Sequence, residues 1–341
     1  MKVALGMLGA AGAVLLTGAM LTLAGWTRPP VHAVQSGYRG TGMAQVTTLR
    51  EETPLRAANV SPPAQDKADH GGEKATVQYK NIKVLNDLSY DEFNRVMLSI
   101  TDWVSPEQGC AYCHNVENLA DDSLYTKVVA RKMLEMTRHI NTDWKAHVAQ
   151  TGVTCYTCHR GEPVPKNIWF KNDGGPHAGG MASDNGGMAL AQKSVGLTGL
   201  PYDPFTPLLE GKEAIRVIST EALPAQKFAA SIQTTERTYG LMIHMSEGLG
   251  VNCTFCHNTR AFSQWPQSPP QRAVAWHGIQ MARDLNTAWL DPLLSVFPAA
   301  RRGPSGDAPK LNCATCHQGV SKPLLGVSLA KDYPELQGAR P

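Results

Sequence analysis

The chain has 341 residues, 42% of them hydrophobic, which is enough to bury the core of one large domain or two medium ones. Lysine and arginine number 32 against 29 aspartates and glutamates, and this net charge of +3 argues against a nucleic-acid binder and against a polybasic membrane patch. The 31 glycines and 23 prolines predict many loops.

The N-terminal segment is an uncharged run from Val3 to Trp26 behind Lys2, which is the pattern of an export signal or a membrane anchor. It is longer than the roughly 7–15-residue core of a cleavable signal, and as a helix it would span a bilayer core of about 30 Å. We therefore expect residues 1–26 to remain as a transmembrane helix, with cleavage after Ala24 as the alternative. In both cases the rest of the chain is exported.

All eight cysteines fall in four Cys-x-x-Cys-His motifs. The cysteines are Cys110 and Cys113, Cys155 and Cys158, Cys253 and Cys256, and Cys313 and Cys316, and the histidines that follow are His114, His159, His257 and His317. This is the attachment signature of c-type haem, in which two thiols bond one porphyrin and the adjoining histidine binds the iron. A single pair could also be a redox dithiol or half of a zinc site. Four copies on an exported chain favour four covalent haems and leave no cysteine for a disulfide.

An internal duplication relates the two halves of the chain. Met97 and Met242 are 145 residues apart and each precedes a motif, and residues 141–144 match residues 286–289 at the same offset. We therefore expect two units, each with two motifs. The expected segments are an anchor at 1–26, an extended N-terminal arm at 27–80 that lies against something else, a first haem-pair unit at 81–165, a Gly/Pro-rich connector at 166–210, a second haem-pair unit at 211–325 and a C-terminal tail at 326–341.

Three helices are predicted around the motifs. Ser89 and Glu92 form a capping box for a helix that ends before Pro106, and a counterpart in the second unit runs from about residue 234 to 248. The longest helix runs from about residue 121 to 150. Short β-like leads are expected at residues 81–85 and 213–218.

The sixth ligands of the irons are sought on these helices, because an electron carrier closes the position that a haem enzyme leaves open. Met97 lies on the apolar face of the first helix, 13 residues before Cys110, and its repeat at Met242 favours a ligand over a core residue. We expect Met97 on the first haem and Met242 on the third, with His244 and Met245 as rivals of Met242.

The long helix carries Met133 and His147 on one face, so it could supply ligands to two irons. Their equivalents in the second half are Gly278 and Pro292, neither of which can bind iron. We therefore expect Met133 on the second haem and His147, reaching across a pseudo-twofold, on the fourth. The rivals are Met136, Met281 and His277. The remaining histidines, His32, His70, His139 and His177, are expected to be solvated.

Residues 80–325, with these motifs and methionines in this order, resemble the tetrahaem cytochrome subunit of purple-bacterial photosynthetic reaction centres. The resemblance implies three His/Met haems and one bis-His haem in two pairs related by a local twofold. It also implies a periplasmic subunit on the L and M subunits that reduces the photo-oxidised special pair. Its electrons would come from a small soluble c-type cytochrome or a high-potential iron–sulfur protein.

The chain departs from those family members that carry a lipid on an N-terminal cysteine, because it has no ninth cysteine. We therefore expect a mainly α multihaem cytochrome c with extensive loops, held at the periplasmic face of the photosynthetic membrane by its N-terminal helix. A membrane-anchored tetrahaem quinol dehydrogenase is the alternative, but that class mostly uses histidine as sixth ligand. A multihaem reductase would need one iron without a sixth protein ligand.

Overall fold

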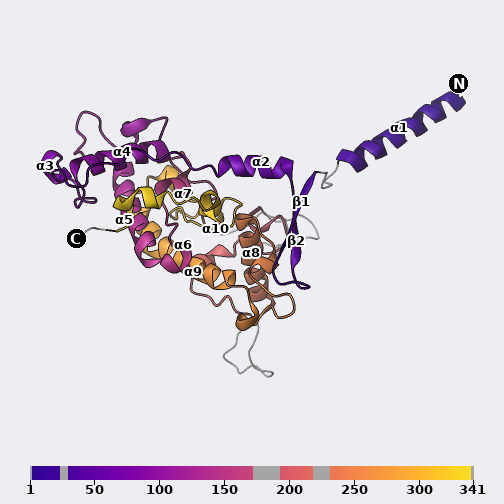
Figure 1. Cartoon of the computed structure of the whole chain (residues 1–341). Helices are drawn as coiled ribbons and strands as arrows, with labels where there is room; N and C mark the ends of the chain where they lie inside the picture. Colours follow the sequence, from indigo (N-terminus) through magenta and orange to yellow (C-terminus); the bar gives the residue numbers. More distant parts are fainter. Residues whose placement is uncertain (1, 24–29, 172–192, 218–230, 339–341) are drawn as a thin grey trace.

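The chain consists mainly of helices and loops, as predicted (Figure 1). The computed structural model describes residues 2–23, 30–171, 193–217 and 231–338, and in the first helix it describes side chains from residue 11 to residue 22. Within these residues there is a single sheet, made of two strands. Residues 172–192 of the expected connector, with His177 among them, lie outside the described residues.

The first helix, α1, runs from Lys2 to Leu23 and extends away from the rest of the molecule (Figure 1). None of the helices in the described residues is both long enough and apolar enough to cross a membrane. The transmembrane helix expected in residues 1–26 is therefore not confirmed. The alternative cleavage position after Ala24 lies outside the described residues.

The expected N-terminal arm lies on both halves of the chain and is only partly extended. Strands β1 (Val31–Ser36) and β2 (Met43–Thr48) form an antiparallel hairpin, followed by α2 (Leu49–Ala58) and the short α3 (Ala75–Gln78). The hydroxyl of Thr254, inside the third motif, donates to the Ser36 carbonyl and accepts from the Met43 amide, both at 2.9 Å. The arm is thus tied to a haem motif.

The helix before the first motif is α4 (Tyr90–Val104). Ser89 accepts from the Glu92 amide while the Glu92 carboxylate accepts from the Ser89 amide, so the predicted capping box is confirmed. Because both partners of the box are satisfied, the helix start is set locally by the sequence.

The long helix predicted from residue 121 to 150 is two helices, so that prediction is wrong. Helix α5 (Tyr125–Asp143) ends at Trp144, whose φ of −105° and ψ of 28° are not helical, and α6 (Lys145–Val148) follows. The Trp144 indole donates to Asp284 at 3.0 Å, and this contact with the second half accompanies the change of direction. Met133 and His147 therefore sit on different helices.

In the second half, α8 (Ile232–Leu249) leads into the third motif and α9 (Gln271–Asp284) follows it. The end of α8 meets the fourth motif, because the Gly319 amide donates to the Gly248 carbonyl at 2.8 Å. The expected β-like leads are wrong for residues 81–85 and 213–217, which form no strand, and residue 218, the last of the second lead, lies outside the described residues.

Two asparagines, one in each half, make matching contacts that reflect the duplication. Asn141 donates to the Val153 carbonyl at 2.9 Å and accepts from the Val153 amide at 2.7 Å. Asn286, 145 residues later, makes the same two bonds with Leu311, at 3.0 and 2.9 Å. Val153 and Leu311 each lie two residues before a motif. Each half therefore uses the amide group of one asparagine to fix the chain entering its second motif.

The predicted C-terminal tail is part of the core. Tyr333 and Leu336 are fully buried, and Glu335 pairs with the buried guanidinium of Arg95 at 3.2 Å. The Arg95 guanidinium also lies 4.0 Å from the centre of the Tyr333 ring. These contacts join residues that are far apart in sequence, which explains why a polar, proline-containing segment gave no signal of its own burial.

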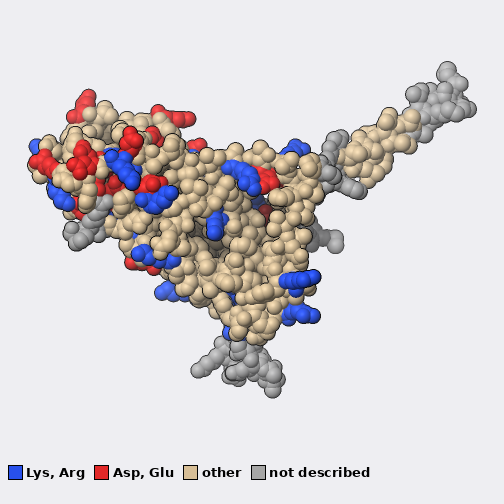
Figure 2. All heavy atoms as spheres, in the orientation of Figure 1, with Lys and Arg blue, Asp and Glu red and all other residues tan. Residues whose placement is uncertain are grey.

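Charged side chains of both signs gather at the end of the molecule formed by α3 and α4, whereas the face over α8 in the same view has few (Figure 2). The apolar core forms two clusters. One contains Leu241, Ile279, Leu285 and Leu290, and the other contains Leu85, Leu88, Val96 and Trp103.

We expect Asn141→Ala to speed hydrogen exchange at the Val153 amide by about 5-fold to 150-fold, since an unpaired buried polar group costs about 1–3 kcal/mol. The Leu311 amide should be unchanged. Asn286→Ala should give the reverse pattern. Exchange measured on the haem-loaded subunit checks this, and equal effects of either substitution on both amides would contradict two separate asparagine contacts.

Candidate functional site

The four motifs fall into two structural types. The first and third motifs begin as 3-10 turns, Gly109–Tyr112 and Cys253–Phe255. The His114 ring donates through Nδ1 to the carbonyl of Leu119 at 3.2 Å, and the His257 ring donates through Nδ1 to the carbonyl of Phe262 at 3.1 Å. In both cases the acceptor lies five residues after the histidine.

The second and fourth motifs are short α-helices, α7 (Cys155–His159) and α10 (Cys313–His317). The hydroxyls of Thr157 and Thr315 accept from the amides that start these helices, each at 3.0 Å. The next residues, Arg160 and Gln318, are left-handed with φ of 53° and 50° and end the helices. Repetition of such an unfavourable backbone state at both motifs shows that the same local geometry is built twice.

In this second type the Nδ1 acceptor lies three residues after the histidine. His159 donates to the carbonyl of Glu162 at 2.9 Å, and His317 donates to the carbonyl of Val320 at 3.0 Å. All four motif rings therefore carry their proton on Nδ1 and leave the Nε2 lone pair available to bind a metal. Protein metal sites use this arrangement to orient a histidine ligand.

Burial keeps these imidazoles neutral. It lowers the pKa of all four motif histidines, and the pKa of His317 falls to about 4 because burial is reinforced by the neighbouring His147. A neutral imidazole is the form that binds a metal.

Four of the motif cysteines are also held in neutral form. Burial raises the pKa of Cys113 and Cys256 to about 11 and that of Cys155 and Cys313 to about 12. A thioether carries no charge, so burying it in apolar surroundings does not incur the desolvation cost of an ion. The thiols and imidazoles together therefore fit covalent haem.

Cys158 and Cys316 form a disulfide, which contradicts the expectation that no cysteine is used in this way. Helices α7 and α10 lie side by side, since Gln318 donates to the Cys158 carbonyl at 3.3 Å and Arg160 to the Cys316 carbonyl at 3.4 Å. This packing brings the two sulfur atoms together. A sulfur atom in a disulfide cannot also form a thioether, so the two uses of these cysteines exclude each other.

The structure brings His147 and His317 together from opposite halves of the chain. Their ring centres are 6.0 Å apart, and the His147 Nδ1 donates to the Val274 carbonyl at 3.0 Å. Both rings thus have Nδ1 occupied and Nε2 free. Because metal–imidazole bonds are about 2 Å long, a metal bound between the two Nε2 atoms would place the ring centres about 6 Å apart.

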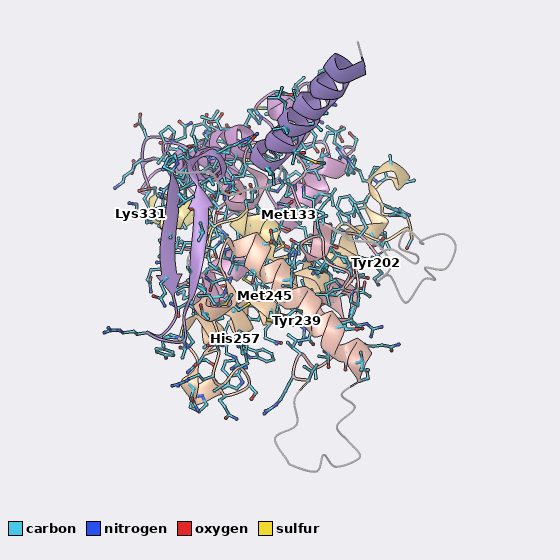
Figure 3. All side chains as sticks on the ribbon, turned by 90° about the vertical axis from the view of Figure 1, so that its right-hand side faces the viewer. Met133, Tyr202, Tyr239, Met245, His257 and Lys331 are labelled. Carbon is cyan, nitrogen blue, oxygen red and sulfur yellow. A yellow bond between two sulfur atoms is a disulfide. The ribbon has the colours of Figure 1, made fainter. Side chains whose placement is uncertain are left out.

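The expected methionine ligands all pack against the apolar clusters near the motifs. Met97 lies against the cluster that also contacts Cys155, and Met133 and Met242 lie against the other cluster. The rivals Met136, Met245 and Met281 also pack against the same cluster as Met133 and Met242. Burial alone therefore does not separate the expected ligands from their rivals. Figure 3 shows Met245 on α8, the helix that carries Met242, with side chains packed around it.

Two other histidines form hydrogen bonds inside the protein. His139 was expected to be solvated, but its two ring nitrogens each lie 2.6 Å from a carboxylate, of Asp143 and of Asp284. His244 is buried and donates to the Ser194 carbonyl at 3.1 Å. Both ring nitrogens of His139 are therefore engaged, whereas only Nδ1 of His244 is, and the buried Nε2 of His244 has no hydrogen-bond partner among the described residues.

Sequence reasoning missed the asparagines and threonines that shape the second and fourth motifs. Asn141 and Asn286 were visible as a repeat, and Thr157 and Thr315 occupy the same place in their motifs. Recurrence at matched positions was thus the signal available for them. Gly278 was seen only as the residue that replaces a ligand, and the structure places it against the His147 ring.

Comparison with known proteins gives the same picture for the whole chain. Residues 27–337 match the family model described as photosynthetic reaction centre cytochrome c subunit. The chain is 54% identical over 333 residues to the photosynthetic reaction center cytochrome c subunit of Rubrivivax gelatinosus, covering 96% of this chain and 88% of that one. It is 48% identical over 318 residues to the subunit of the same name from Thermochromatium tepidum, covering 93% and 78%.

A third such subunit, from Roseobacter denitrificans, is 43% identical over 319 residues, covering 89% of this chain and 85% of that one. The family model spans both duplicated units and all four motifs. The chain therefore belongs to the family of photosynthetic reaction centre cytochrome c subunits, and it is an electron carrier with covalently bound haem c rather than an enzyme.

Proposed function

We propose that the chain holds four haems c and passes electrons from a soluble periplasmic donor to the photo-oxidised special pair of a reaction centre. The observation that supports this most directly is the pairing of His147 with His317, two neutral imidazoles with free Nε2 atoms. An iron closed on both sides by protein ligands suits electron transfer, which needs little rearrangement between oxidation states.

The ligands proposed are those expected from the sequence. Each motif histidine would bind one iron, and Met97, Met133, Met242 and His147 would supply the second protein ligand of the first to fourth haems. When bound, the haem iron supplies a one-electron couple whose potential depends on its ligands, hydrogen bonds and burial. The chain's part is to hold each ring by its Nδ1 bond and to exclude water around it.

The cysteines of all four motifs are proposed to form thioethers. This assigns Cys158 and Cys316 to separate haems and requires that their disulfide be absent from the mature subunit. The motif spacing and the family support this assignment.

The partners proposed are the L and M subunits, on which the protein would sit at the periplasmic face, and a small c-type cytochrome or a high-potential iron–sulfur protein as donor. A place in the reaction centre at the photosynthetic membrane follows from the family. Anchoring by residues 1–26 stays a prediction from the sequence.

In the assembled complex, we expect a short flash to oxidise haem in this subunit as the special pair is re-reduced. Complexes that lack the subunit should re-reduce the special pair more slowly, by at least about tenfold. Transient absorption of the haem and special-pair bands in the same sample checks this. Re-reduction at an unchanged rate without the subunit would contradict the proposed role.

His147→Met should raise the potential of the fourth haem by on the order of 0.1 V, since methionine favours the ferrous state relative to histidine and axial ligands span roughly 0.8 V. Met133→His is the matched control and should lower the potential of the second haem. A spectroscopic redox titration of the complex resolves both. If His147→Met moves the second haem instead, the ligand assignment is wrong.

A further inference from the structure

Gly278 lies inside α9, where glycine is unfavourable for a helix. Its backbone is ordinary helix, so no left-handed conformation requires glycine there. A glycine at such a position calls for a packing or functional reason, and one such reason is a neighbour that approaches the backbone closely.

The close neighbour is the ring of His147. A Cβ atom on residue 278 would lie 2.6 Å from Cε1, 2.9 Å from Nδ1 and 3.2 Å from Nε2 of that ring. Turning the ring away would break a hydrogen bond, because its Nδ1 donates to the carbonyl of Val274, on the same helix. Even one methyl group at position 278 would therefore have to displace the imidazole.

The duplication adds an independent observation at the same position. Gly278 is the counterpart of Met133, and Pro292 is the counterpart of His147, both at the offset of 145 residues. Where the first half has a long sulfur-containing side chain, the second half has none, and a ring from the first half fills the space.

We propose that Gly278 is the positioning residue that selects histidine as the sixth ligand of the fourth haem. Its missing side chain admits His147, and a side chain at this position excludes it. A methionine there restores the ligand that the first half uses. This inference rests on the ligand set of the proposed function.

The test compares Gly278→Ala and Gly278→Met in the full haem-loaded complex, with Ala273→Met as the matched control on an exposed position of the same helix. Electron paramagnetic resonance of the ferric haems separates bis-His from His/Met ligation. We expect both Gly278 variants to lose the bis-His signal. Gly278→Met should also gain a fourth methionine-ligated haem and a higher potential, and the control should match wild type. A bis-His signal retained in both Gly278 variants would overturn the proposal.

A second experiment covers the case in which the variants do not fold. His147→Ala removes the ring that a new side chain would strike and should leave the fourth haem without its sixth ligand. Adding Gly278→Met should then restore a low-spin haem with His/Met ligation, whereas adding Ala273→Met should not. A fourth haem that stays high-spin in the Gly278→Met double variant would refute the proposal.

The wild-type spectrum separates this inference from the proposed function. Absence of a bis-His haem, or its survival in His147→Ala, would mean that the ligand set itself is wrong. A bis-His signal that depends on His147 but not on residue 278 would contradict the role of Gly278 and leave the proposed ligand set intact.

Discussion

The hydrogen bond from the Nδ1 atom of each motif histidine to a nearby carbonyl is the constraint on which the site depends. It sets the tautomer, leaves Nε2 available to bind an iron and holds the ring while burial keeps it neutral. The bond is local, three or five residues long, so it can be repeated wherever the motif is repeated. The larger structure has only to bring a second ligand to the opposite side.

How that second ligand arrives differs between the halves, and the difference explains the architecture. In the proposed ligand set, Met97 on α4 and Met242 on α8 serve the motifs that these helices precede, so they need no partner from the other half. His147 instead approaches α9 of the other half, where its Nδ1 is held by the Val274 carbonyl. The duplicated units thus share local construction but are not interchangeable.

Much of the site could be predicted from the sequence, because its chemistry depends on residues separated by short, fixed spacings. The four motifs, the capping box of Ser89 and Glu92, and the duplication each depend on residues close together or at one offset. The break at Trp144 and the burial of Tyr333 depend on partners in distant segments, Asp284 and Arg95. Periodicity carries no information about such contacts, and the same limit applies to His139, whose carboxylate partner Asp284 lies in the other half.

The pairing of His147 with His317 has a consequence for assembly. One ring belongs to the first unit and the other to the second, so neither unit contains both imidazoles. If the two rings bind the fourth haem as proposed, a fragment of either half would lack one of that haem's two protein ligands. The spectrum of that haem would then report whether the two halves of the chain have docked during maturation of the subunit.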